Sequence, residues 1–361
     1  MYSDGDPIEA VSQRLDSFVQ DQRAVVGDWG DEAARFVDAG AAALRGGKRL
    51  RARFCLTGWQ AVAAHRRPAT PGADVITAAA ALEVFQAAAL VHDDLVDNSD
   101  TRRGRPASHR ALEAAHRSSG WDGDAAEFGR SAAILLGDLL VAWSDDLLET
   151  GLSESAHAAA ARGVYATMRR DVTIGQFLDV AEEAAFRSAP ESEHAARALR
   201  VASLKSARYS VQQPLLLGAA LAGADAAQND ALEAFGHPVG MAFQLRDDVL
   251  GVFGDAAVTG KPSGDDLREG KRTLLVAYAR ENLAPGARRV FDELVGDPAL
   301  DDEQVASLQS TIIDTGALTR VEAHIAAYAG DADRALRGAP LDNAAVSTLR
   351  DLARAATARV S

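Results

Sequence analysis

Residues 90–97, Leu-Val-His-Asp-Asp-Leu-Val-Asp, carry three aspartates at a spacing that suits metal binding. On a helix, Asp93 and Asp97 lie four positions apart and share one face, whereas Asp94 lies about 100° around the axis from Asp93. Like charges at this spacing destabilise an isolated helix, so a bound cation is the natural compensation. Carboxylates without cysteines or paired histidines favour Mg²⁺ over Zn²⁺. A lone motif of this kind is, however, about as often only a solvated helix end.

A second acidic pair, Asp247 and Asp248, ends the apolar segment 243–251. It is followed by a glycine-rich run, residues 260–273, in which Lys261 and Lys271 are suited to binding phosphate oxygens as point charges. Two acidic helix ends facing each other across a bundle would hold several Mg²⁺ ions around one polyphosphate. Metal held jointly by protein carboxylates and substrate phosphates is the usual arrangement for Mg²⁺.

Basic residues gather in two short segments, although the chain has 52 acidic and 38 basic residues and a formal charge of −14. Residues 46–51 are Gly-Gly-Lys-Arg-Leu-Arg, and residues 102–106, directly after the first acidic motif, are Arg-Arg-Gly-Arg-Pro. Taken singly, each is more often a solvated basic turn. Beside acidic metal motifs, they indicate an anion site, because arginine pairs suit bidentate phosphate contacts. The pattern therefore suggests two phosphorylated ligands, one held through Mg²⁺ and one held directly by Lys and Arg.

Helices must position these motifs. Of the 361 residues, 47% are hydrophobic and only 6% are aromatic, and the dominance of Ala and Leu favours helix over strand. Segments rich in Pro, Gly and Asp separate long Ala/Leu-rich stretches. The clearest such stretches are Val75–Asp97, Ala125–Glu149, Ser155–Glu183 and Ala195–Ala222. Long helices with short connections predict an all-α bundle, and no shift in composition divides residues 1–361 into separate domains.

Pro214 lies inside the last of these stretches. Because proline has no backbone N–H, it leaves a carbonyl without its helical partner. We therefore expect a kink near Tyr209–Ser210.

The net charge argues against nucleic acid or an anionic membrane as the main partner. Cys55 is the single cysteine, so no internal disulfide can form, and a reducing compartment fits. The first residues show neither a basic segment nor an apolar one, and no apolar run reaches 18 residues without a charge. We expect a cytoplasmic protein without a membrane span.

Seven motifs occur between about residues 40 and 280 in the order found in the trans-isoprenyl diphosphate synthase, or polyprenyl synthetase, family. The chain resembles bacterial geranylgeranyl diphosphate synthases of that family. The motifs are GGKRLR (46–51), HDDLVD (92–97), RRGRP (102–106), GQFLD (175–179), KS (205–206), FQLRDD (243–248) and GKPSGDDLREGKRT (260–273). The resemblance implies a single all-α domain around a deep central cavity, usually in a homodimer. Residues 281–361 would form a further helical part whose role is open.

The resemblance also implies roles for individual residues. Asp93, Asp94 and Asp97 would hold two Mg²⁺ ions with the allylic diphosphate, and Asp247, helped by Asp248, would hold a third. The positions that match contacts to the allylic diphosphate are Arg102, Lys205, Ser206, Gln244, Lys261 and Lys271. Those that match contacts to isopentenyl diphosphate are Lys48, Arg51 and Arg103. Gln176 and Asp179 match the motif that lines the upper cavity.

The implied reaction joins isopentenyl diphosphate to an allylic diphosphate: dimethylallyl, geranyl or farnesyl diphosphate. Cations stabilise the departing diphosphate, the alkene attacks the allylic carbocation, and the released diphosphate takes the proton. The chain departs from the family pattern at two positions. Gly251 replaces the last aspartate of the second acidic motif. Gln86 replaces a histidine that contacts isopentenyl diphosphate in many members.

Small residues before the first motif favour a long product. In the family, bulky side chains four and five positions before the first aspartate stop growth early, whereas here those positions are Ala89 and Ala88. We expect geranylgeranyl diphosphate, with Phe85 as the next floor. Farnesyl diphosphate and products of 25 or more carbons stay open as alternatives. So do a class I terpene cyclase, an HD-type phosphohydrolase and a non-catalytic partner subunit.

Overall fold

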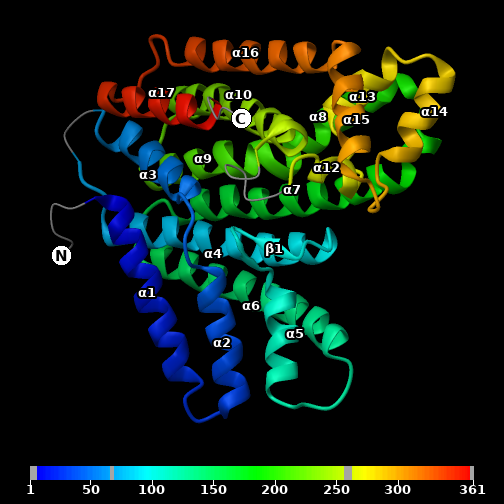
Figure 1. Cartoon of the computed structure of the whole chain (residues 1–361). Coiled ribbons are helices and arrows are strands. Elements are labelled where there is room, and N and C mark those ends of the chain that lie inside the picture. Colours follow the sequence, from blue (N-terminus) through cyan, green and yellow to red (C-terminus); the bar gives the residue numbers. More distant parts are fainter. Residues whose placement is uncertain (1–5, 66–68, 256–261, 358–361) are drawn as a thin grey trace.

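The computed structural model describes residues 6–65, 69–255 and 262–357 (Figure 1). In chain order the elements are α1 (Pro7–Val25), α2 (Asp31–Ala43), α3 (Leu50–Ala63), α4 (Ala73–Val96), β1 (Thr101–Arg102), β2 (Arg105–Pro106), α5 (Ser108–Ser118), α6 (Ala125–Leu152), α7 (Ala158–Ala185), the 3₁₀ turns η1 (Phe186–Ser188) and η2 (Glu191–Glu193), α8 (His194–Val201), the π-helix η3 (Ala202–Gln212), α9 (Gln213–Leu221), α10 (Ala226–Phe253), α12 (Asp265–Glu269), α13 (Leu274–Glu281), α14 (Pro285–Leu294), α15 (Asp302–Asp314), α16 (Ala317–Ala335) and α17 (Asn343–Thr357).

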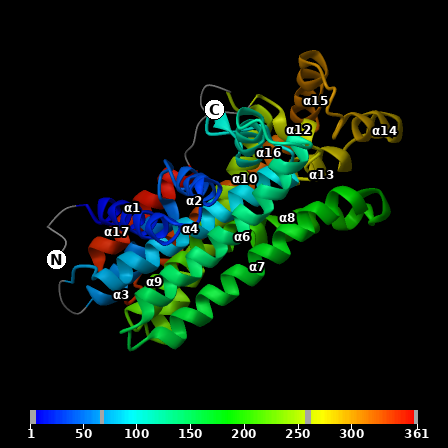
Figure 2. The ribbon, with the colours of Figure 1, turned by 90° about the horizontal axis from the view of Figure 1, so that it is seen from below.

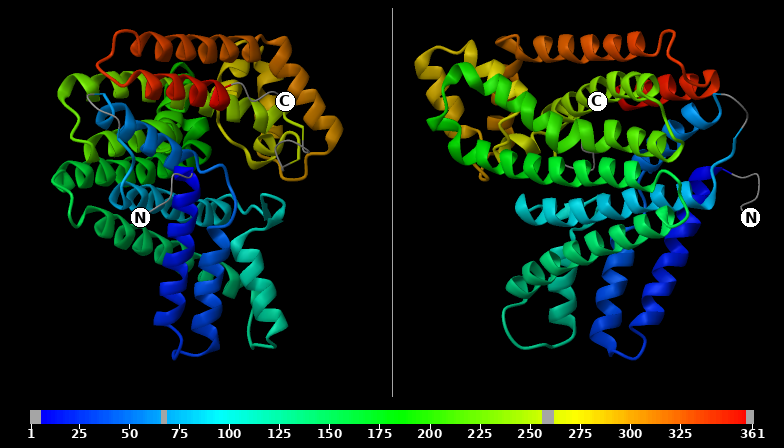
Figure 3. Two further views of the ribbon diagram at one scale, coloured as in Figure 1. Left: turned by 90° about the vertical axis from the view of Figure 1, so that its left-hand side faces the viewer. Right: turned by 180° about the vertical axis from the view of Figure 1, so that it is seen from behind.

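The all-α prediction is confirmed, because the only strands among the described residues are β1 and β2, of two residues each, which pair antiparallel between α4 and α5. The long helices α4, α6, α7 and α10 run along one direction of the bundle, and α1, α2 and α5 project from it across that direction (Figures 1 and 3). Helices α16 and α17 cover the side opposite to that projection (Figure 1). The view from below shows α6 and α7 along one edge of the molecule (Figure 2).

Helix α4 forms the centre of the largest apolar cluster. Its residues from Val75 to Phe85 are all buried, which explains why its sequence is apolar around the whole helix rather than on one face. Within the part of the chain that the structure describes, α4 is the one helix long and apolar enough to cross a membrane, and 78% of its most apolar window is buried inside the protein. The apolar character of α4 is therefore accounted for by packing inside the bundle.

Side-chain caps fix where the longest helices begin. Asp124 accepts hydrogen bonds from the backbone N–H groups of Ala126 and Glu127 at the start of α6. At the start of α10, Asp225 and Gln228 form a reciprocal capping box. These caps satisfy N–H groups that have no partner within the helix. They fix the residue at which each helix begins, and so the face of α10 on which its aspartates lie.

The disturbance predicted near Pro214 is longer than a single kink. The eleven residues of η3 are π-helical, and Pro214 is the second residue of the α-helix that follows. Two glycines allow neighbouring helices to touch this wider turn. A Cβ atom on Gly175 of α7 would lie 2.4 Å from the backbone nitrogen of Lys205, and one on Gly240 of α10 would lie 2.3 Å from the carbonyl oxygen of Ala207. The π-helix is thus held between α7 and α10 at backbone contact.

Candidate active site

A cavity of about 560 Å³ opens between α4, α7, η3, α10 and the loop that carries α12. It is lined by polar side chains from motifs that are far apart in the sequence, together with apolar residues that include Leu90, Val172 and Phe243. The predicted site residues that line it are Lys48, Arg51, Gln86, Asp93, Arg102, Gln176, Asp179, Lys205, Ser206, Gln244, Asp247, Asp248 and Lys271. Lys261, which was also predicted, lies outside the described residues.

The three aspartates of the first motif have different surroundings. Asp94 is buried and accepts a hydrogen bond of 2.7 Å from Nε of Arg102, which the hairpin after α4 places beside it. Asp93 faces the cavity and lies 3.3 Å from Nη2 of the same arginine. Burial by itself would raise the pKa of Asp93, but Lys205, Lys271 and Arg102 outweigh it and hold that pKa below its usual range. Asp93 therefore stays charged.

Asp97, at the end of α4, differs because its Oδ2 atom is buried and has no hydrogen bond. Burial and the nearby charge of Asp93 raise its pKa to about 6. The nearest cation is Lys271, whose Nζ lies 3.4 Å from Oδ2. This carboxylate is the least satisfied polar group of the first motif.

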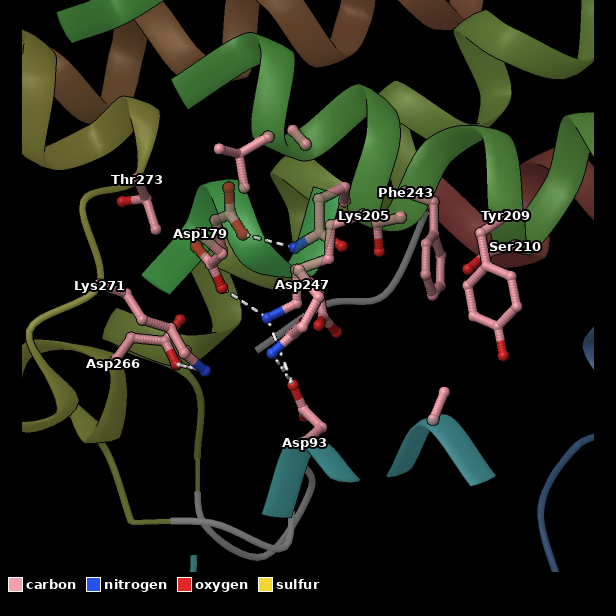
Figure 4. Close-up of a pocket in the computed structure, with 18 of the residues that line it drawn as sticks. Asp93, Asp179, Lys205, Tyr209, Ser210, Phe243, Asp247, Asp266, Lys271 and Thr273 are labelled. Atoms are coloured by element: carbon pink, nitrogen blue, oxygen red, sulfur yellow. Dashed lines mark hydrogen bonds and ion pairs between the residues drawn. The ribbon is translucent and has the colours of Figure 1, made fainter. Parts of the chain in front are cut away.

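Lys205 joins the two walls of the cavity (Figure 4). Its Nζ donates to Oδ2 of Asp179 on α7 at 2.5 Å and lies 3.3 Å from Oδ1 of Asp93 on α4. Gln176, one turn before Asp179, donates to Asp93 at 3.2 Å. Burial would lower the pKa of Lys205, but Asp93 and Asp179 outweigh that effect and raise the pKa above its usual value. The amine is therefore cationic and sits among carboxylates.

The second acidic motif lies on α10, which forms another wall of the cavity. Asp247 faces the cavity, and Asp248 is buried and accepts a hydrogen bond of 2.7 Å from Nε2 of Gln244. Burial and the charges of Asp266 and Asp247 raise the pKa of Asp248 to about 8. A divalent cation beside these groups would therefore relieve a concentration of negative charge.

Lys271 contacts three carboxylates, two from its own loop and one from the end of α4. Its Nζ lies 2.7 Å from Glu269, 3.4 Å from Asp97 and 3.5 Å from Asp266. Burial would lower its pKa, but these three charges raise it well above the usual value. Like Lys205, Lys271 is a cation held where a negatively charged ligand can exchange with its carboxylate partners.

Lys48 and Arg51, which are predicted to bind the second phosphorylated ligand, also line the cavity. Arg51 donates to Oγ of Ser210 at 2.7 Å, and its guanidinium lies 4.1 Å from the ring centroid of Tyr209. The hydroxyl of Tyr209 donates to Oε1 of Gln86 at 2.6 Å. Arg103 is exposed, and its guanidinium lies against Gly47 in the loop before Lys48, outside the lining of the cavity.

The residues present fit Mg²⁺ shared with a ligand better than a site made by protein alone. Among the described residues, no group of three His, Cys, Asp or Glu side chains could hold a metal ion by itself. Carboxylates nevertheless line both walls, and Oδ2 of Asp97 is buried without a hydrogen bond. Mg²⁺ commonly takes one or two protein carboxylates and completes its shell with phosphate oxygens and water. Oxygen donors in this arrangement match that behaviour.

Sequence reasoning did not assign roles to Tyr209, Asp266 or Glu269. Tyr209 lies one helical turn after Lys205, and that spacing was a usable signal for a shared face. Asp266 and Glu269 were visible within the glycine-rich run, but acidic residues there have no periodicity that indicates where they point. Only the fold places them beside Lys271.

Comparison with known proteins gives a consistent result. The model of the polyprenyl synthetase family matches residues 35–312. A geranylgeranyl pyrophosphate synthase from Corynebacterium glutamicum, solved with isoprenyl diphosphate and magnesium, is 40% identical, with a TM-score of 0.91 and coverage of 98% of each chain.

Two curated relatives have names with other product lengths. A geranylfarnesyl diphosphate synthase from Aeropyrum pernix is 32% identical over 284 residues, 78% of this chain and 81% of the relative. A (2E,6E)-farnesyl diphosphate synthase from Mycobacterium bovis is 30% identical over 303 residues, 83% of this chain and 75% of the relative. These relatives differ in the product length that their names give, but all are prenyl diphosphate synthases. The chain therefore belongs to the polyprenyl synthetase family and is a trans-isoprenyl diphosphate synthase, a prenyltransferase.

Proposed function

We propose that the protein condenses isopentenyl diphosphate with an allylic diphosphate in the cavity described above, and that its main product is geranylgeranyl diphosphate. The observation that carries the reaction is the position of Lys205, which joins Asp93 of the first acidic motif to Asp179 on the facing helix. In this arrangement the lysine can bind the phosphate oxygens of a ligand, and the carboxylates can bind the metal ions that accompany it.

The allylic diphosphate binds between α4 and α10. Lys205, Lys271 and Arg102 exchange carboxylate partners for its oxygens, and their charges stabilise the leaving group as the carbon–oxygen bond breaks. Three Mg²⁺ ions, held by Asp93, Asp97 and Asp247 with support from Asp94 and Asp248, would supply further charge stabilisation when bound. Ser206 and Gln244 add hydrogen-bond donors from η3 and α10.

Isopentenyl diphosphate binds at the basic end of the cavity. Lys48 and Arg51 hold its diphosphate, with Arg103 at the rim, and Gln86 and Tyr209 lie beside them. The new carbon–carbon bond forms from the alkene of this substrate, and the released diphosphate accepts the proton. Val172 and Phe243 keep water from the carbocation.

Product length depends on the wall formed by α4. Ala89 lines the cavity, whereas Ala88 is buried in the core and so cannot limit the chain directly. Phe85 packs edge-to-face against both Tyr165 and Tyr209, at centroid distances of 6.1 Å and 5.7 Å. A small residue at position 89, with this aromatic cluster one turn earlier on α4, supports a tail of about twenty carbons.

The reaction is tested with purified protein, Mg²⁺, isopentenyl diphosphate and, separately, dimethylallyl, geranyl or farnesyl diphosphate, with products sized by mass spectrometry. A series of products ending at twenty carbons is expected. If the folded protein elongates none of these primers, the proposed synthase activity is overturned and a non-catalytic partner subunit is favoured. Cyclised hydrocarbon from a single allylic diphosphate would indicate a terpene cyclase instead.

The wall itself is tested by Ala89→Phe. The larger ring would fill the space beside Gln86 and Leu90, so the main product is expected to shorten by at least one five-carbon unit. Ala88→Val is the matched control, because its side chain points into the core rather than into the cavity. An unchanged product from Ala89→Phe would show that another wall sets the length.

We also propose that the protein is a homodimer. Exposed apolar side chains lie on α6 (Ile134 and Leu135) and on α7 (Ile174, Phe177 and Val180). The two helices are joined by the ion pair of Asp145 with Arg169. Apolar side chains gathered on neighbouring helices favour association with a second copy.

A further inference from the structure

The second acidic motif has one carboxylate fewer on its helix than the first motif has. On α4, Asp93 and Asp97 are separated by one turn; on α10 the corresponding pair is Asp247 and Gly251. Residues at this spacing share a helix face, so Gly251 leaves a gap on the face that carries Asp247. Both residues line the cavity.

The carboxylate of Asp266 fills this gap. A Cβ atom built on Gly251 would lie 2.0 Å from Oδ2 and 2.4 Å from Cγ of Asp266. Both distances are far below any non-bonded contact, so the two side chains could not coexist in these positions. Asp266 therefore brings a carboxylate to the place where the side chain of residue 251 would start, from a residue on the following loop.

The backbone around Asp266 is held in place. Leu267 is completely buried, and its carbonyl oxygen accepts a hydrogen bond of 2.8 Å from the N–H of Gly296. The carbonyl oxygen of Asp266 accepts one of 3.0 Å from the N–H of Lys271. Gly264 before it adopts a left-handed conformation, with φ of 74°, which turns the chain toward α10. The position of the carboxylate thus follows from a packed frame.

The surroundings of Asp266 are those of the second acidic motif. It lines the same cavity as Asp247 and Asp248, and its charge contributes to the raised pKa of Asp248. Lys271 lies 3.5 Å from its Oδ1 (Figure 4). The same amine lies 3.4 Å from Oδ2 of Asp97 of the first motif. The side chain of Asp266 is 14% exposed, so it remains accessible to a ligand in the cavity.

We propose that Asp266 is the third carboxylate of the second acidic motif: it replaces, from the loop, the side chain that Gly251 lacks, and it helps Asp247 and Asp248 to hold the divalent cation on that wall. This inference rests on the proposed function, because it concerns the metal-bound diphosphate of that reaction. It assigns Gly251 a purpose, which is to leave room for the carboxylate of Asp266.

Moving the carboxylate between the two positions tests the proposal. The measurement is Mg²⁺-dependent binding of inorganic diphosphate by isothermal titration calorimetry, which does not require turnover. Asp266→Ala is expected to weaken binding by roughly tenfold or more. Gly251→Asp combined with Asp266→Ala should recover most of that loss, because the helix then supplies the carboxylate. Gly251→Ala combined with Asp266→Ala, which adds volume without charge, should not.

Two further variants complete the design. Gly251→Asp alone should lower the melting temperature, because its side chain overlaps Asp266. Asp314→Asn, at an exposed aspartate on α15, should bind diphosphate as the unaltered protein does. If Asp266→Ala does not fold, Asp266→Asn keeps the shape of the side chain and removes only the charge.

The outcomes separate this inference from the proposed function. If the unaltered protein bound diphosphate with no dependence on Mg²⁺, the metal-dependent function would fail. If it bound normally and Asp266→Ala and Asp266→Asn bound equally well, only the role of Asp266 would be overturned. Equal affinity of the two double variants would overturn the equivalence of positions 251 and 266.

Discussion

At the scale of single residues, the site is organised by cations that already have partners. Lys205, Lys271 and Arg102 each contact at least two carboxylates. Those of Lys205 and Lys271 come from different segments, and those of Arg102 are neighbours on α4. This arrangement offsets the cost of gathering aspartates in a partly buried cavity. It also means that a single substitution leaves no cation without a carboxylate, so function can be altered without loss of the fold.

Asp93→Ala applies this reasoning. Lys205 would keep Asp179 and Arg102 would keep Asp94, so the variant is expected to fold, while loss of the carboxylate facing the cavity lowers kcat by about 100-fold or more. Steady-state kinetics together with a thermal melt measure both effects. Retained activity would refute the assignment of Asp93 to the metal-bound diphosphate.

Asp97 predicts a pH dependence. Its pKa of about 6 is raised, so in the free protein it becomes protonated as the pH falls below 6. Metal binding needs the ionised form, so Mg²⁺-dependent affinity for diphosphate should fall by up to tenfold per pH unit below that point. Diphosphate itself also changes protonation with pH. Asp97→Asn lacks the carboxyl group at position 97, so its pH profile gives the contribution of the ligand alone. Identical pH profiles for the two proteins would contradict the prediction.

At the scale of elements, the π-helix is the part that presents Lys205, Ser206 and Tyr209 together. The wider turn persists because glycines on α7 and α10 let both neighbours reach its backbone. The sequence indicated a disturbance through Pro214, but the extent of the π-helix depends on the packing of two other helices. Proline removes one hydrogen bond, whereas the neighbours decide how the chain rearranges around it.

Gly175→Ala tests this contact. A Cβ atom 2.4 Å from the backbone nitrogen of Lys205 would push α7 away from η3, so unfolding free energy should fall by about 1–3 kcal/mol, with a loss of activity as Lys205 moves. Gly163→Ala is the matched control on the same helix, because nothing lies within 4 Å of its added Cβ. Chemical denaturation compares the two. Equal stability would show that the contact is not limiting.

At the scale of the whole molecule, the apolar residues on α6 and α7 carry the prediction of a homodimer. Phe177 is 69% exposed, and Phe177→Glu should convert dimer to monomer in sedimentation or light-scattering measurements. Val290→Glu is the control, because Val290 is also exposed but lies on α14. A monomeric unaltered protein would contradict the proposal.

A single domain over residues 1–361 and a cytoplasmic location stay predictions.

The sequence alone determined the helical class, the long helices and the order of the acidic and basic motifs. These properties are local: periodicity, caps and glycine or proline breaks act over a few residues, so α4 and α6 appear within three residues of their expected limits. The motifs also carried the family resemblance, which gave the reaction class. Lys261 could not be compared, because it lies outside the described residues.

Only the tertiary structure decided how side chains within a motif divide their work. Asp93 faces the cavity while Asp94 is buried against Arg102, and Ala89 lines the cavity while Ala88 is in the core. Asp266 reaches the space left by Gly251 from a loop fifteen positions later in the chain. Such contacts depend on where helices cross and how a loop is anchored, and these are products of packing over the whole chain that no local pattern of residues records.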